Sequence, residues 1–138
     1  MAESTPARAR PVSPHVQLDA PIWRWHITMF TSIAHRATGV ALYGAALILA
    51  GWALALASGA QAYGAYMALL GSIPGKLVMF AITISAFYHL AAGVRHLIWD
   101  AGEGFDIKSA NLGSWLIIGF SVVASILVWV LAFATGAA

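Results

Sequence analysis

Residues 87–100 read F-Y-H-L-A-A-G-V-R-H-L-I-W-D and end an apolar run that is long enough to cross a lipid bilayer. This stretch also carries His89, Arg95, His96 and Asp100. Polar and ionisable groups at membrane depth are costly, so they indicate a functional site. The stretch therefore predicts both a membrane-spanning helix, over about residues 77–99, and the place where a ligand binds.

The composition places the whole chain in the membrane class. Of its 138 residues, 61% are hydrophobic and 9% are charged, against about 25% charged in a soluble domain. Seven Lys and Arg residues, spread along the chain against five acids, exclude a nucleic-acid-binding surface. The chain has no cysteine, which excludes disulfides, thiol nucleophiles and iron–sulfur clusters and leaves histidine or oxygen ligands for any metal.

Three apolar segments predict an all-α integral membrane protein with helices over about residues 29–57, 77–99 and 112–134. Residues 29–138 form one membrane domain in this prediction, and residues 1–28 form an extended arm because four prolines interrupt any helix there. Residues 60–70 fit a short interfacial helix, and Pro74-Gly75 predicts a break before the second span. The third span has no ionisable residue and is interpreted as packing and anchoring only.

The distribution of Lys and Arg predicts the orientation in the membrane. With three spans, the N-terminus and the second loop share one side, and Lys76 is the one basic residue of the other side. The first side carries Arg8, Arg10, Arg24, Arg36, Arg95 and Lys108. The positive-inside rule therefore predicts the N-terminus inside. The first apolar run is too long for a signal peptide and the N-terminus is a poor transit peptide, so we expect a bacterial inner membrane rather than a mitochondrial one.

His89 is the candidate metal ligand. It lies ten residues from the inner end of its span, which is about 15 Å deep in an upright helix. Ala92 and Gly93 share its face and are predicted to leave a gap in which a flat macrocycle fits, and neutral imidazole is a common axial ligand of haem iron. The alternative is a histidine that is hydrogen-bonded to a neighbouring helix.

Neither of the two nearest histidines is predicted to be the second axial ligand. His96 lies seven residues from His89, about 10.5 Å along the axis, whereas two axial nitrogens on one iron lie about 4 Å apart. His35 is expected near the inner surface and therefore at a different depth from His89. A six-coordinate haem would then take its other ligand from another chain.

Polar residues at the inner mouth predict a second ligand site. His35, Arg36, Arg95 and His96 form a cationic rim that suits haem propionates or a quinone carbonyl. Ser32, Arg36 and Asp100 suit a quinone, whose reduction develops negative charge that a hydroxyl and a guanidinium stabilise. The alternatives are snorkelling arginines, the positive-inside bias and ordinary polar groups at helix ends.

Two motifs in these segments resemble one known family. Residues 32–40, S-I-A-H-R-A-T-G-V, resemble its S-I-x-H-R-x-[ST]-G-V motif, and residues 89–100 resemble its H-x-x-x-G-[IV]-R-H-[LM]-x-x-D motif. The family is that of succinate dehydrogenase cytochrome b556 subunits, the membrane anchors of respiratory complex II. The resemblance covers about residues 10–104, including R-P-V-S-P-H at 10–15, and departs from the family at His26 and at residues 19–22.

The resemblance implies roles for individual residues. His89 would be an axial ligand of haem b, shared with a companion membrane anchor subunit that supplies the second ligand. Ser32 and Arg36 would line a ubiquinone site, with Asp100 near it. His35 and His96 would lie at the propionates or at the rim of the site.

The resemblance also implies partners for the chain. A flavoprotein subunit and an iron–sulfur subunit would complete the complex on the inner surface of the lipid bilayer. No succinate chemistry is expected in this chain, which has neither cluster cysteines nor a nucleotide-binding glycine motif. The alternatives are the anchor of a fumarate reductase that uses menaquinone, and a haem-free structural membrane protein.

Overall fold

The computed structural model describes residues 25–136, and every regular element within them is a helix. The helices are α1 (Ile27–Ala57), α2 (Ala60–Gly71), α3 (Ile73–Asp100) and α4 (Ile107–Ala134). The all-α prediction is therefore confirmed, as is the short helix between the first two spans. The predicted N-terminal arm falls almost entirely outside the described residues.

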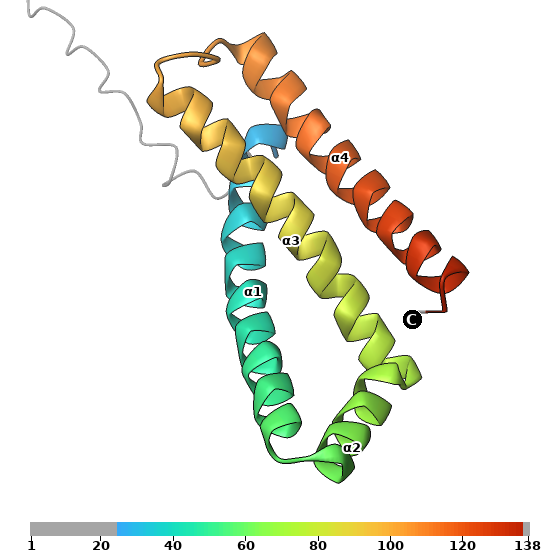
Figure 1. Cartoon of the computed structure of the whole chain (residues 1–138). Helices are drawn as coiled ribbons and strands as arrows, with labels where there is room; N and C mark the ends of the chain where they lie inside the picture. The colour runs from blue at the N-terminus through green and yellow to red at the C-terminus, as the bar shows by residue number, and fades with distance from the viewer. Residues whose placement is uncertain (1–24, 137–138) are drawn as a thin grey trace, which may run out of the picture.

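The three long helices form an antiparallel bundle in which α3 lies between α1 and α4, and α2 joins the far ends of α1 and α3 (Figure 1). They contain 31, 28 and 28 residues and are apolar enough to cross a membrane, which confirms the three predicted spans. At 1.5 Å per residue they exceed a hydrocarbon core of about 30 Å, so their ends extend into the headgroup layers. The inside location of the N-terminus stays a prediction.

Side-chain caps make two of the spans begin earlier than predicted. The Ser72 hydroxyl accepts a hydrogen bond from the Gly75 amide at 3.2 Å, and Pro74 lies in the first turn of α3, where its missing N–H needs no partner. The predicted break at Pro74-Gly75 is therefore wrong. Asp106 caps α4 by accepting from the Ser109 amide at 2.9 Å, and this bonding holds the pKa of the Asp106 carboxyl below its usual value.

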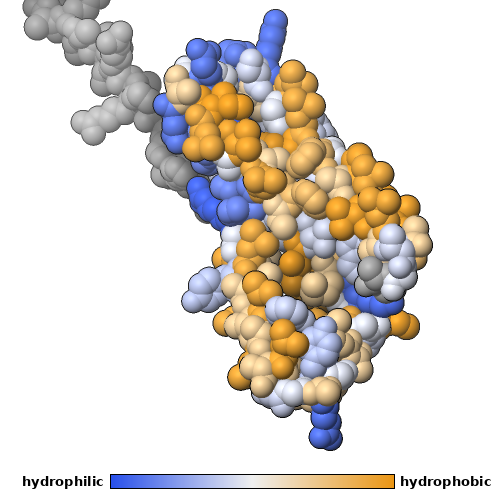
Figure 2. Space-filling model, in the orientation of Figure 1, coloured by the Kyte–Doolittle hydropathy of each residue, from blue (hydrophilic) through white to orange (hydrophobic). Residues whose placement is uncertain are grey.

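The interior of the bundle is small and polar, and its outside is apolar. Hydrophobic side chains cover much of the visible face of the long helices (Figure 2). The most deeply buried side chains are instead small ones: Thr31, Ala92, Ser114, Ser121 and Ser125. Small residues let membrane helices approach closely. Close approach stabilises the bundle, because dispersion forces and hydrogen bonds rather than the exclusion of water hold membrane helices together.

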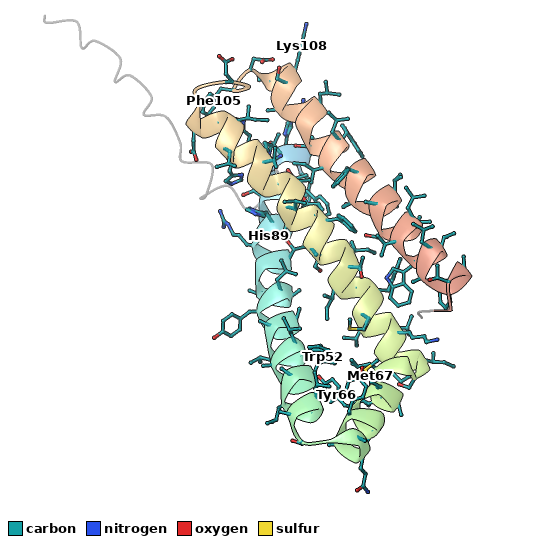
Figure 3. The ribbon with its side chains drawn as sticks, viewed as in Figure 1. Trp52, Tyr66, Met67, His89, Phe105 and Lys108 are labelled. Atoms are coloured by element: carbon teal, nitrogen blue, oxygen red, sulfur yellow. The ribbon has the colours of Figure 1, made fainter. Side chains whose placement is uncertain are left out.

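Both ends of the bundle are fixed by aromatic side chains. At one end the Tyr66 hydroxyl donates to the Ile48 carbonyl at 2.7 Å, so α2 folds back against α1, and Trp52 and Met67 lie in the same corner (Figure 3). At the other end Trp99 donates to the Gly104 carbonyl at 3.2 Å and stacks on Phe105. The connection between α3 and α4 is therefore tied down.

Gly75→Ala is expected to destabilise the corner between α2 and α3. A Cβ at this position would overlap the backbone carbonyls of Leu69 and Leu70, which cannot move without unwinding the end of α2. We expect a loss of about 1–3 kcal/mol, measured as a lower thermal midpoint of the purified protein in detergent. Gly71→Ala is the matched control, because a Cβ there meets nothing within 4 Å. Equal midpoints for the two variants would contradict the tight contact.

Candidate functional site

Helix α3 presents two stripes of side chains, one residue apart along the chain. The first stripe faces the interior of the bundle and consists of Tyr88, Ala92, Arg95 and Trp99. The second stripe lies beside α1 on a more open face and consists of His89, Gly93, His96 and Asp100. Both stripes follow the same spacing of four, three and four residues, which keeps each on one face of the helix.

The second stripe meets α1 in a cluster of three imidazole rings. The ring centroids of His35 and His89 lie 4.3 Å apart, and those of His35 and His96 lie 4.9 Å apart. The predicted difference in depth between His35 and His89 is therefore wrong. The antiparallel packing explains the error, because His35 lies about 12 Å from the start of α1 and His89 about 16 Å from the end of α3.

Contacts with α1 orient the ring of His89, which lies where α3 crosses α1 (Figure 3). Its Nδ1 is 3.3 Å from the His35 carbonyl oxygen and 3.4 Å from the Thr38 hydroxyl. In the tautomer in which Nδ1 donates to that carbonyl, Nε2 carries the free lone pair that a metal requires. His89 can therefore be hydrogen-bonded to the neighbouring helix through Nδ1 and still act as a metal ligand through Nε2.

Glycines on both helices leave room around this ring. A Cβ at Gly39 would come within 3.2 Å of the His89 Cε1, whereas a Cβ at Gly93 would meet nothing within 4 Å. Ala92 does not contribute to the gap, contrary to the prediction, because it is fully buried in the core with Tyr88 and Ile117. Gly39 therefore makes room for the His89 ring itself, and the open space on α3 lies at Gly93.

His35 carries a second indication of a ligand. Its Nε2 is buried and has no hydrogen-bond partner among the described residues. Buried polar side-chain atoms are nearly always hydrogen-bonded, so an unpaired one suggests a group that is bound in the functional state. Within residues 25–136 no group of three or more His, Cys, Asp or Glu side chains is arranged to hold a metal ion, so the three clustered imidazoles do not form a three-ligand metal site.

The predicted quinone residues lie at one end of the bundle. Ser32 and Arg36 belong to the first turns of α1, and Asp100 is the last residue of α3, which runs in the opposite direction. Ser32 is half-buried, while Arg36 and Asp100 are exposed. The fold thus brings Ser32 and Asp100 towards the same end of the bundle, while Arg36, one residue beyond His35, lies deeper along α1.

Arg95 lies apart from the rim to which it was assigned from the sequence. Its side chain is 6% exposed and points into the bundle, where Nη1 donates to the Thr31 hydroxyl and to the Ser114 hydroxyl, each at 3.0 Å. Neither hydroxyl was predicted from the sequence to contact Arg95. Thr31 directly precedes the motif at 32–40, and Ser114 is a polar residue within the third span, which therefore does more than pack.

Comparisons with known proteins show which family this chain resembles. A family model described as succinate dehydrogenase/fumarate reductase transmembrane subunit matches residues 6–128. The chain is 37% identical over 121 residues to a succinate dehydrogenase cytochrome b556 subunit of Rickettsia felis, covering 88% of this chain and 91% of the relative. It is 33% identical over 124 residues to that of Paracoccus denitrificans, covering 90% and 92%. A mouse mitochondrial cytochrome b560 subunit is 30% identical over 118 residues, covering 84% and 68%.

Proposed function

The chain belongs to the family of succinate dehydrogenase/fumarate reductase transmembrane subunits, and we propose that it is the cytochrome b anchor of a succinate:ubiquinone oxidoreductase. In this role it holds a flavoprotein subunit and an iron–sulfur subunit on the inner membrane of a bacterium. It binds haem b together with a companion anchor subunit and forms part of the site of ubiquinone reduction. The geometry around His89 is the observation that carries the proposal.

The side chains around His89 fit a haem b. The carbonyl of His35 orients the imidazole so that Nε2 would be available to iron, Gly39 lets the ring lie against α1, and Gly93 leaves space for the edge of a macrocycle. His35, His96 and Arg36 would supply donors for the propionates. When bound, the haem supplies a one-electron redox centre.

The second axial ligand belongs to the companion anchor in this proposal. The ring centroids of His35 and His89 lie 4.3 Å apart. An iron bound between the rings would need about 4 Å between the two ligating nitrogens alone. Each ring centroid lies farther from the iron than its nitrogen does, so this spacing leaves no room for an iron. That another chain supplies the second ligand therefore stays a proposal, supported by the distance between the His35 and His89 rings rather than by their depths in the membrane. His35 orients the His89 ring through its backbone carbonyl, and its own ring lies beside that of His89.

Ser32 and Arg36 are proposed to bind the quinone. They lie four residues apart on one face of α1, so the hydroxyl and the guanidinium can donate to the same carbonyl oxygen. Their hydrogen bonds strengthen as that oxygen gains negative charge during reduction. Asp100, exposed at the same end, is placed to pass protons from water, while the electrons arrive from the iron–sulfur subunit.

Loss of the haem tests the assignment of His89. His89→Ala is expected to abolish the b-type α-band in the reduced-minus-oxidised spectrum of the purified complex, because this chain then offers no axial ligand. Gly39→Leu should lower haem content to about half or less, because its side chain overlaps the His89 ring. Gly44→Leu is the control, since a Cβ there meets nothing within 4 Å. A normal band in His89→Ala would refute the ligand assignment.

Quinone kinetics test the site at the mouth. Arg36→Leu removes a charged donor, so the apparent KM for ubiquinone should rise about tenfold or more. Succinate oxidation with a water-soluble artificial acceptor should stay at the parental rate, since that reaction does not use this chain. Lys108→Leu removes an exposed charge from the same end of the bundle (Figure 3) and should leave the KM unchanged. An unchanged KM in Arg36→Leu would reject the site.

A further inference from the structure

Arg95, Thr31 and Ser114 form a polar contact that joins the three membrane-spanning helices. The two N–H groups of Arg95 Nη1 reach the hydroxyl of Thr31 on α1 and that of Ser114 on α4, each at 3.0 Å. The two hydroxyl oxygens are themselves 3.2 Å apart. Thr31 and Ser114 are fully buried, so water does not share these bonds.

Both hydroxyls are arranged as acceptors for the arginine. Thr31 Oγ1 donates its own proton to the Thr28 carbonyl at 3.0 Å, and Ser114 Oγ donates to the Ala110 carbonyl at 2.9 Å. Each oxygen therefore turns its lone pairs towards Nη1. Bonds to a charged donor are stronger than neutral ones, so this contact fixes the relative positions of the helices that supply it.

The guanidinium depends strongly on these two acceptors. Its Nε and Nη2 are buried without a hydrogen-bond partner among the described residues. The Trp99 ring, 4.7 Å from the guanidinium carbon, adds a cation–π contact. Loss of either hydroxyl would leave a buried charge still less satisfied, and that is more damaging than an ordinary lost hydrogen bond.

The contact lies next to the proposed quinone site along α1. Thr31 directly precedes Ser32. Its carbonyl also accepts a hydrogen bond from the Tyr88 hydroxyl at 3.1 Å, so both its side chain and its backbone are held by α3. Thr31 is therefore held in place relative to the rest of the bundle. The residues that follow it along α1 are Ser32 and, one turn later, His35 and Arg36.

We propose that Arg95 is a positioning residue that acts through Thr31 to fix the first turns of α1, and thereby Ser32 and Arg36, for quinone binding. The inference rests on the proposed function and gives Arg95 a role distinct from the propionate rim. Arg95 touches neither the quinone nor the haem in this arrangement. It determines where the residues that do so are held.

Thr31→Val tests the proposal with a small change. Valine keeps the shape of threonine and removes the acceptor. We expect the apparent KM for ubiquinone to rise about tenfold, while kcat stays within about twofold of the parent and the haem band is retained. Thr31→Ser, which keeps the hydroxyl, should restore the parental KM.

Thr83→Val is the matched control. The Thr83 hydroxyl accepts from Trp129 Nε1 at 3.1 Å, so this variant also breaks one hydrogen bond between two helices, but towards the opposite end of the bundle. It should lower the thermal midpoint, though less than Thr31→Val because no buried charge loses an acceptor, and leave the KM for ubiquinone unchanged. A general loss of stability would instead raise the KM equally in both variants and would overturn the proposal.

A double-variant cycle tests whether Thr31 acts through Arg95. If it does, Thr31→Val combined with Arg95→Met should raise the KM no further than Arg95→Met alone, because the shared contact is already lost. Additive increases would show that Thr31 acts independently and would reject the positioning role. Arg95→Met replaces the buried charge with an apolar side chain of similar length, so no unsatisfied donor remains to unfold the bundle.

Ser32→Ala and Arg36→Leu separate this inference from the proposed function. If both raise the KM and Thr31→Val does not, the positioning role fails and the quinone site stands. If neither raises the KM, the quinone site is rejected and the positioning role is rejected with it.

Discussion

A buried guanidinium determines how the three spans fit together. Inside a membrane, polar groups find no water, so Arg95 has to be paired by neighbouring helices. Its Nη1 reaches hydroxyls on α1 and α4 at the same time, so one nitrogen of α3 links the other two spans. The small residues of the interior, such as Ala92 and Ser125, permit the close approach that this contact requires.

In the proposed function, the two stripes of α3 separate helix packing from ligand binding. The stripe that contains Arg95 is buried and joins the helices, whereas the stripe that contains His89 is open and carries the imidazoles. Adjacent residues on a helix point about 100° apart, so Arg95 and His96 serve different faces although they are neighbours in sequence. A histidine whose ring is oriented by a rigid neighbouring helix is well suited to hold a redox centre in one geometry.

The sequence predicted the three spans better than it predicted how their side chains meet. Long apolar runs define spans because the bilayer sets their length. Helix starts were missed at Ser72 and Asp106, where caps outweigh the hydropathy signal. The error over His35 arose because this residue was assigned to the membrane surface, whereas it lies eight residues inside α1, which begins at Ile27. The partners of Arg95 come from two other helices, and no local pattern reports such contacts.

In the proposed function, the open stripe is the side on which another chain would complete the haem site. The faces that meet lipid and the faces that meet another membrane helix are equally apolar, so hydrophobicity does not separate them. Imidazoles do separate them, because a ring turned towards hydrocarbon would keep its polar atoms unpaired. His96 is exposed and His89 is half-buried on this one side of α3. In the proposed function, therefore, the haem and the companion anchor have to cover the side of α1 and α3 that carries the three histidines, and the remaining apolar faces are left for lipid.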